Sequence, residues 1–258
     1  GDTLTEDLDL SYRAQLKKWD FKYLEDVETP AELPVAISAA RSQQFRWNKG
    51  AAENFQKLYG RLLKDPSVSF KTKFHSFFHL LNSSMFLLVL LVAILSVPIL
   101  YIKNNNPAYS WYFNVIAAFA VSTVIFFGCY WVTYKRIHGG GIKNFFKYIG
   151  MFFTFFSVAM GFSVHNSLAV LEGHFGKKSE FIRTPKFNVS KLGEQWSGNI
   201  YLKKNLSSGM LLESILFLYF GFAIYSAFKV NDFGLILFHL MLFAGFGFVA
   251  FKSIFSRI

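Results

Sequence analysis

The spacing of hydrophobic residues changes near residue 72 of the chain. Before it, apolar residues recur at helical intervals among many charged ones, and after it they form long runs. Each of four such runs holds about 20 or more mostly apolar residues, which is enough for a helix to cross a bilayer. We therefore expect an α-helical polytopic membrane protein with transmembrane helices at residues 77–102, 111–134, 210–228 and 233–251.

A further apolar segment, residues 142–171, carries a narrow stripe of polar or small residues at roughly helical spacing. If it crossed the bilayer, the basic stretch that follows would break the positive-inside rule. We therefore interpret the segment as an interfacial or re-entrant helix that begins and ends on the cytoplasmic side. A cytoplasmic loop at residues 172–208 follows it. His165 and Asn166 favour a buried polar pair over a metal or acid–base site, because no partner lies at ligand spacing.

The chain before the first run is too short for a complete domain. Residues 3–18 predict a helix that begins with a capping box at Thr3 to Glu6. Residues 21–27 partly alternate and predict a short strand. Residues 1–49 are too few for an independent nucleotide-binding α/β domain, so we expect them to be the C-terminal end of a larger cytoplasmic one.

An amphipathic pattern follows Gly50. Apolar residues such as Phe55 and Leu58 mark one face, and charged or amide side chains occupy the rest. This predicts an interface helix at residues 50–72 that lies on the membrane. The alternative is a soluble helix packed on a core. Residues 73–258 then form the membrane domain.

Composition agrees with a membrane protein. The 258 residues are 53% hydrophobic and include 33 Phe, and the net charge is +11. We attribute the charge to the Lys and Arg of cytoplasmic loops, with anionic membrane lipid as a further partner. No nucleic-acid motif is present, so no nucleic-acid partner is expected. The single cysteine, Cys129, excludes a disulfide within the chain. The start without Met or a signal peptide indicates a fragment or a truncated gene product.

One short motif combines an amide, a guanidinium and an indole. Gln43, Arg46 and Trp47 form a Gln-x-x-Arg-Trp pattern. Arg makes bidentate contacts to phosphate oxygens, and Trp offers a flat apolar face for a sugar ring. By itself the pattern is more typical of an amphipathic helix start with a Trp at the membrane surface.

Two further motifs lie on either side of it in the sequence. Thr5-Glu6-Asp7 places a carboxylate at a helix N-terminus, which keeps it ionised and suits a general base. The same residue types also occur as simple helix caps. Phe181-x-x-Thr184-x-Lys186 supplies a hydroxyl and an ammonium for a phosphate site when a loop closes. The alternative for that segment is a solvated basic loop near anionic lipid.

These three motifs, in this order and with membrane spans between the last two, resemble the processive family-2 glycosyltransferases. That family includes cellulose synthases, hyaluronan synthases and mannan-synthase-like enzymes. Residues 30–50 look most like the cellulose-synthase-like branch near the mannan synthases. Arg183 stands where the family usually has Val. The resemblance implies Asp7 as the catalytic base, substrate contacts by Thr5, Glu6, Gln43, Arg46 and Trp47, and a gating loop with Phe181, Thr184 and Lys186.

The resemblance also implies the reaction and its setting. The expected protein is the C-terminal part of a membrane-embedded inverting β-glycosyltransferase, with the remnant of a GT-A type domain and channel-forming spans. Its partners would be a nucleotide diphosphate sugar and a glycan acceptor, with Mg or Mn whose ligands are not visible here. The location would be the cell membrane, or the Golgi membrane in a eukaryote, with the catalytic side cytoplasmic. The isolated chain is expected to be inactive.

The rival hypothesis is a small non-enzymatic polytopic membrane protein, such as a scaffold or a transporter subunit. It explains the apolar runs and the charge. It leaves the three spaced motifs as coincidence.

Overall fold

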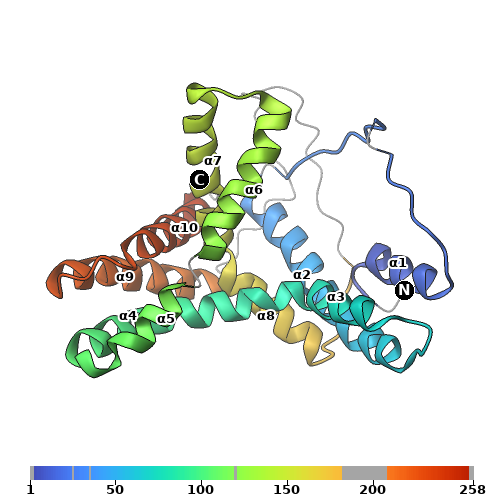
Figure 1. Cartoon of the computed structure of the whole chain (residues 1–258), viewed down its shortest axis with the longest axis horizontal. Helices are drawn as coiled ribbons and strands as arrows, with labels where there is room; N and C mark the ends of the chain where they lie inside the picture. Colours follow the sequence, from blue (N-terminus) through green and yellow to red (C-terminus); the bar gives the residue numbers. More distant parts are fainter. Residues whose placement is uncertain (1–2, 25, 35, 119–120, 182–207, 256–258) are drawn as a thin grey trace. The chain divides into compact units, whose positions relative to one another are not determined.

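The computed structural model describes residues 3–24, 26–34, 36–118, 121–181 and 208–255 (Figure 1). Within these residues the regular elements are all helical, and no strand occurs. The helices are α1 Glu6–Leu16, α2 Ile37–Lys64, α3 Phe70–Leu81, η1 Asn82–Ser84, α4 Met85–Asn105, η2 Pro107–Tyr109, α5 Ser110–Ala118, α6 Val121–His138, α7 Ile142–Gly161, α8 Ser163–His174, α9 Ser208–Lys229 and α10 Ile236–Phe255.

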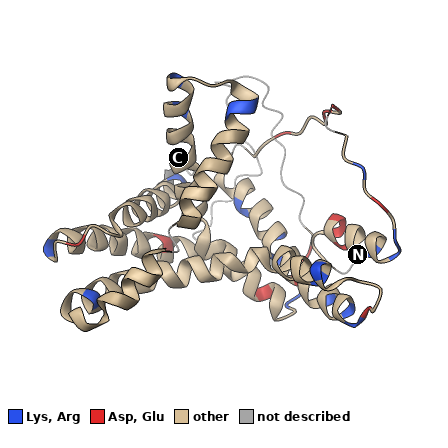
Figure 2. Ribbon diagram, viewed as in Figure 1, with Lys and Arg blue, Asp and Glu red and all other residues tan. Residues whose placement is uncertain are grey.

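Four helical segments of the described chain are long and apolar enough to cross a membrane, which confirms the predicted number. They are Phe70–Asn105, Pro107–His138, Gly209–Lys229 and Ile236–Ile254. Figure 2 shows that α4 and α6 carry charged residues only near their C-terminal ends. The first segment begins earlier than expected because α3, η1 and α4 follow one another without a break. Ser69 caps its start by accepting a hydrogen bond from the amide of Thr72 at 3.2 Å.

The segment predicted as an interfacial helix forms two helices. α7 and α8 are separated by Phe162, and the pair is bent by 52° there. A bend of this size fits either a broken span, which would be a fifth crossing, or a re-entrant path. Its position at the membrane surface stays a prediction.

The chain forms two compact units. The first holds residues 1–90, 162–210 and 251–258, and the second holds residues 91–161 and 211–250. In the first unit α2 packs along α8 and α3, with a core of Tyr12, Leu58, Leu62 and Leu80. In the second, α7 and α10 cross so closely that a Cβ on Gly245 would lie 1.9 Å from the Ser157 carbonyl oxygen.

The predicted strand at residues 21–27 is wrong. Its described residues have no regular structure, and Phe21, Tyr23 and Val27 are 64%, 88% and 61% exposed. A strand needs a neighbour for its backbone groups, and none of the described residues provides one. The remnant of an α/β domain is therefore not confirmed.

The predicted bounds of the two N-terminal helices also need correction. The amphipathic helix expected at residues 50–72 begins at Ile37 and ends at Lys64, so Gln43, Arg46 and Trp47 lie inside it. Gly50 does not start the helix; instead it provides space for a neighbouring segment. The capping box is wrong as well, because α1 begins at Glu6 and its N-cap, Thr5, makes no side-chain cap hydrogen bond.

Candidate functional site

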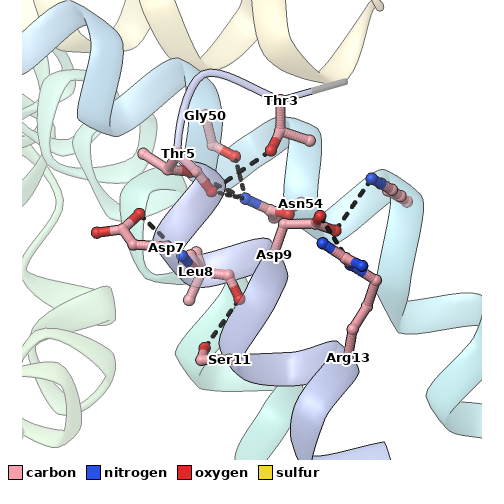
Figure 3. A network of polar contacts seen from close by, with 10 residues as sticks. Thr3, Thr5, Asp7, Leu8, Asp9, Ser11, Arg13, Gly50 and Asn54 are labelled. Atoms are coloured by element: carbon pink, nitrogen blue, oxygen red, sulfur yellow. Dashed lines mark hydrogen bonds and ion pairs between the residues drawn. The ribbon is translucent and has the colours of Figure 1, made fainter. Parts of the chain in front are cut away.

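The N-terminus of α1 is docked on the middle of α2 (Figure 3). The side-chain amide of Asn54 donates to the Thr5 carbonyl at 3.1 Å, to the Thr5 hydroxyl at 2.9 Å and to the Gly50 carbonyl at 3.1 Å. Asn54 is fully buried. A Cβ on Gly50 would lie 2.6 Å from the Thr5 hydroxyl oxygen, so the two segments meet only because residue 50 is glycine. The Thr5 hydroxyl is thus committed to α2 and not to capping its own helix.

A carboxylate of α2 satisfies the next backbone donor. The Glu53 carboxylate accepts a hydrogen bond from the amide of Leu4 at 2.8 Å. Amides before a helix have no intrahelical partner, so this contact stabilises the entry into α1. Glu53 therefore fixes the segment that leads into Thr5-Glu6-Asp7.

The two nearby aspartates of α1 have different surroundings. Asp7 is exposed, and within the described part of the chain its carboxylate accepts only a local hydrogen bond, from the Leu8 amide at 2.8 Å. Asp9 is 1% exposed and forms ion pairs with Arg13 at 2.9 Å and Lys57 at 3.0 Å. Burial alone would raise the pKa of Asp9, but Lys57 and Arg13 outweigh it and hold this pKa below its ordinary value. Of the two carboxylates, only Asp7 is accessible to a substrate.

A polar stripe runs along α2 from the second motif. Arg46, Lys49, Glu53 and Gln56 are spaced three, four and three residues apart, so they share one face of the helix. The guanidinium carbon of Arg46 lies 4.9 Å from the centre of the Phe181 ring. This distance is within the range of a cation–π contact. The second and third motifs therefore meet in space at Arg46 and Phe181.

Lys49 is the most deeply buried cation of this stripe. Its side chain is 0% exposed, and its ammonium pairs with the Glu172 carboxylate at 3.1 Å. It also donates to the hydroxyl of Ser179. The other oxygen of Glu172 accepts from Lys177. A buried ammonium requires such partners, because an unpaired one is costly to desolvate.

A cavity of about 490 Å³ lies where the docked α1 entry meets the segment after α8. Its lining comes from the start of the chain, from α2 and from the residues that lead to Phe181. The lining residues are Thr3, Leu4, Glu6, Glu53, Lys178, Ser179 and Phe181. The cavity is thus lined by residues of the first and third motifs. A second opening of similar size shares Thr3, Glu53 and Lys178 with it.

The structure places the predicted site residues unevenly. Thr5, Glu6, Arg46 and Phe181 belong to the contacts described above. Gln43 is half-buried and Trp47 is 49% exposed, and neither lines the cavity. Thr184 and Lys186 lie outside the described residues.

Sequence reasoning missed the residues that join the motifs. They are Lys49, Glu53, Asn54 and Glu172. Asn54 was placed on the polar face of the expected amphipathic helix, and because it is fully buried that placement is wrong. No pattern in the sequence singled out Lys49.

His165 is half-buried and Asn166 is buried, and the side-chain oxygen of Asn166 has no hydrogen-bond partner among the described residues, so the predicted satisfied pair is found only in part. The His165 ring contacts the Arg41 carbonyl at 2.9 Å through Nε2 and lies against Phe45. Asn166 is 1% exposed. Among the described residues, no group of three or more His, Cys, Asp or Glu side chains is placed to hold a metal ion.

Comparison with known proteins gives one family and a set of plant relatives. A family profile described as "Glycosyl transferase family group 2" matches residues 1–171. "Probable glucomannan 4-beta-mannosyltransferase 2" of Oryza sativa subsp. japonica is 37% identical over 100 residues, which cover 38% of this chain and 17% of the relative. "Glucomannan 4-beta-mannosyltransferase 7" of Arabidopsis thaliana is 40% identical over 73 residues, 28% of this chain and 13% of the relative.

A longer match covers more of the chain at lower identity. "Probable glucomannan 4-beta-mannosyltransferase 6" of Oryza sativa subsp. japonica is 28% identical over 198 residues, 74% of this chain. That match spans 31% of the relative, so the chain corresponds to less than a third of the proteins it resembles. No solved structure matches.

Proposed function

The chain belongs to glycosyl transferase family group 2, and we propose that it is the membrane-associated part of an enzyme that adds sugar to a growing β-glycan. The donor would be a nucleotide diphosphate sugar and the acceptor the end of the glycan. The names of its relatives favour mannose as the sugar and a glucomannan-like polymer as the acceptor. A non-enzymatic scaffold would leave the family match unexplained.

One observation carries this proposal. Thr3, Leu4 and Glu6 line the same cavity as Ser179 and Phe181, although helices α2 to α8 separate these two groups in the sequence. Arg46 of the second motif lies over Phe181. Glu6 of the first motif and Phe181 of the third thus line one opening large enough for a sugar residue, and Arg46 of the second motif contacts Phe181, whereas Asp7, Gln43 and Trp47 are not among the lining residues. This gathering favours a common substrate over three unrelated structural roles.

Asp7 is our proposed general base. In an inverting transfer, an acceptor hydroxyl attacks the anomeric carbon from the face opposite the leaving diphosphate. The bond from that carbon to the diphosphate oxygen breaks, and the hydroxyl proton passes to the base. An exposed carboxylate in the first turn of a helix stays ionised and reachable. Asp9 does not suit this role because its carboxylate is buried in two ion pairs.

The remaining motif residues would bind the substrates. Arg46 and Gln43 are proposed to contact the diphosphate or the acceptor, and the exposed Trp47 to stack on the acceptor sugar. Thr184 and Lys186 would lie near the diphosphate. These roles rest on residue chemistry and on the family resemblance.

A divalent metal, Mg or Mn, is proposed for the complete enzyme only. The described residues do not provide a fitting ligand set, since they hold no cluster of three acidic, His or Cys side chains. Asp7 and Asp9 do not make one, because Asp9 is already paired with Lys57 and Arg13. No step of the transfer is assigned to a metal through this chain.

The membrane part is proposed to form one side of a channel for the growing polymer. The apolar segments support a membrane location. We place the catalytic side in the cytoplasm, in the Golgi membrane or the cell membrane. We further propose that the nucleotide site lies outside these 258 residues, so the chain alone turns over no donor.

Radiolabelled sugar incorporation tests the proposal. The complete transferase that contains this chain is expressed in membranes and supplied with a panel of nucleotide sugars. Incorporation into an alkali-insoluble β-glycan from one or two donors, mannose foremost, is expected. Absence of incorporation from every donor would refute transferase activity. Turnover by the purified 258-residue chain would refute the external nucleotide site.

A further inference from the structure

A ten-residue segment is held against the polar stripe of α2. This anchor segment, residues 172–181, contains the end of α8 and leads to Phe181. The His174 ring contacts the Gln56 amide at 3.1 Å through Nδ1 and the Ser84 hydroxyl at 2.8 Å through Nε2. A Cβ on Gly173 would lie 2.6 Å from the Lys49 carbonyl oxygen, so the two backbones touch. The segment therefore follows α2 from Gln56 back towards Arg46.

The chain reverses inside this segment. α8 ends in two hydrogen bonds, from the Lys177 amide to the Glu172 carbonyl at 2.9 Å and from the Gly176 amide to the Gly173 carbonyl at 3.2 Å. Gly176 has a φ of 69°, the left-handed conformation that this type of helix end requires. The turn brings Ser179 back to the level of Glu172. Residues on both sides of the turn thereby face the same point of α2.

Lys49 lies at that point. Its ammonium contacts Glu172, before the turn, and Ser179, after it. Phe181, two residues after Ser179, lies against the guanidinium of Arg46. Arg46 is about one helical turn before Lys49 on α2. An ammonium with no exposure to solvent strongly prefers its anionic partner. Lys49 thus couples the helix that carries Gln-x-x-Arg-Trp to the approach of the third motif.

We propose that Lys49 and Glu172 are positioning residues that fix the anchor segment on α2 and so align Phe181 with Arg46. The effect on catalysis rests on the proposed function, whereas the fixing of the segment does not. The competing explanation is that the ion pair only compensates a buried charge. The two explanations differ when both charged side chains are removed together. No buried charge then needs compensation, but the hydrogen bond from Lys49 to the Ser179 hydroxyl is still lost.

Limited proteolysis of the detergent-purified chain separates these explanations. Trypsin cleavage after Lys177 and Lys178 is followed by mass spectrometry, since cleavage reports how often the segment leaves α2. Lys49→Met should speed this cleavage by about tenfold, the effect of losing a hydrogen bond to a charged group. Lys49→Met combined with Glu172→Met should be cleaved as fast after Lys178, although its thermal stability recovers. Only Lys178 is compared in variants of residue 172, because Lys177 pairs with Glu172 and loses that partner as well. Lys49→Glu with Glu172→Lys should slow cleavage after Lys178 again.

Lys57→Met is the matched control. Lys57 is on the same helix and lines the second opening beside the anchor segment, but its ammonium pairs with Asp9 of α1 at 3.0 Å. Its removal should leave cleavage after Lys177 and Lys178 at the parent rate. The proposal fails if folded Lys49→Met is cleaved at the parent rate, or if the double Met variant is as resistant as the parent. It fails equally if Lys57→Met is cleaved as fast as Lys49→Met.

A kinetic measurement on the complete transferase tests the consequence for catalysis. Lys49→Met should lower kcat/KM, and the charge-exchanged pair should recover part of it. If cleavage is faster but kcat/KM is unchanged, Lys49 does fix the anchor segment on α2, and the result counts against a catalytic function of the Phe181 region. Unchanged cleavage with lowered activity would reject the positioning role alone.

Discussion

The guanidinium of Arg46 lies over the ring of Phe181, 4.9 Å from its centre. Arg46 belongs to a helix near the start of the chain, and Phe181 follows α8. The anchor segment leads to Phe181, which is 48% exposed. The contact is therefore partly open to solvent and of moderate strength.

A double-mutant cycle measures this contact. Phe181→Leu and Arg46→Met should each lower the stability of the chain, and their coupling energy should be about 0.5–1 kcal/mol, as for a partly exposed cation–π pair. Thermal unfolding in detergent provides the four values. Arg61→Met replaces Arg46→Met in the control cycle, because Arg61 is four helical turns further along α2. Equal coupling in both cycles would show that the contact contributes nothing specific.

Replacement of the proposed base tests the catalytic assignment. Asp7→Asn retains capping capacity but cannot accept the hydroxyl proton, so kcat of the complete enzyme should fall by roughly 10²-fold or more. Donor affinity, measured by calorimetry, should be unchanged. Asp20→Asn, in an exposed stretch outside the candidate site, is the control for the loss of an acidic side chain. Near-parent synthesis by folded Asp7→Asn enzyme would remove Asp7 from the mechanism.

Much of the fold follows from local sequence, and the contacts within the site do not. Long apolar runs predict spans because the bilayer imposes a minimum length, which is why all four were found. The motifs identified Arg46 and Phe181 as candidate site residues from their side-chain chemistry. Their contact depends on Lys49 and Glu172, two charged residues that sequence periodicity alone would place on the polar face of a helix. Periodicity cannot predict that a charged side chain is buried, because burial depends on a partner that is distant in the sequence.

Gly50 explains the error at the start of α2. A glycine near a change in pattern favours a helix boundary, because it lowers helix propensity. Here close approach by Thr5 requires glycine, so the helix continues through it. The strand expected at residues 21–27 failed for the opposite reason, since alternation without a pairing partner yields no strand.

The ion pairs of the buried Asp9 in α1 should be sensitive to acid. Asp9→Asn should lower stability at neutral pH by roughly 2 kcal/mol, the value of hydrogen bonds to a charged group. The folded-state pKa of Asp9 lies below its ordinary value of 3.8, so its stabilisation is complete above that value. It is lost as the pH falls through the lower, folded-state pKa. The gap between parent and variant should thus close only below about pH 4.

Thermal unfolding across pH 3 to 7 checks the Asp9 prediction. Asp20→Asn, in an exposed stretch, is the control and should stay close to the parent throughout. A gap between parent and Asp9→Asn that is constant over the whole range would contradict an ionised, paired Asp9.

The membrane orientation makes a separate prediction. With Cys129 replaced by Ser, single cysteines are placed at Glu180 and Lys229, which lie on either side of the apolar helix α9. In sealed vesicles with the cytoplasmic face outward, an impermeant maleimide should label Glu180→Cys directly and Lys229→Cys only after detergent. This follows from the cytoplasmic assignment of residues 172–208. Labelling of both without detergent in vesicles shown to be sealed would contradict a crossing by α9.

Two glycines of α2 should respond oppositely to the same substitution. Gly50→Ala places a Cβ 2.6 Å from the Thr5 hydroxyl oxygen and 2.7 Å from the Thr5 amide nitrogen, so backbone must move. Overpacking of this kind costs about 1–3 kcal/mol. Gly60 has no atom within 4 Å of such a Cβ. Gly60→Ala should therefore stabilise the chain by about 0.5–1 kcal/mol, the gain in helix propensity.

Thermal unfolding of both alanine variants decides whether α1 is docked on α2. Trypsin cleavage after Arg13 supplies a second readout, because Arg13 is in α1 and becomes accessible when that helix leaves α2. Gly50→Ala should speed this cleavage, and Gly60→Ala should not. If both variants were stabilised to the same extent, Gly50 would be an ordinary helix glycine. The contact that brings Thr5-Glu6-Asp7 to the site would then be refuted.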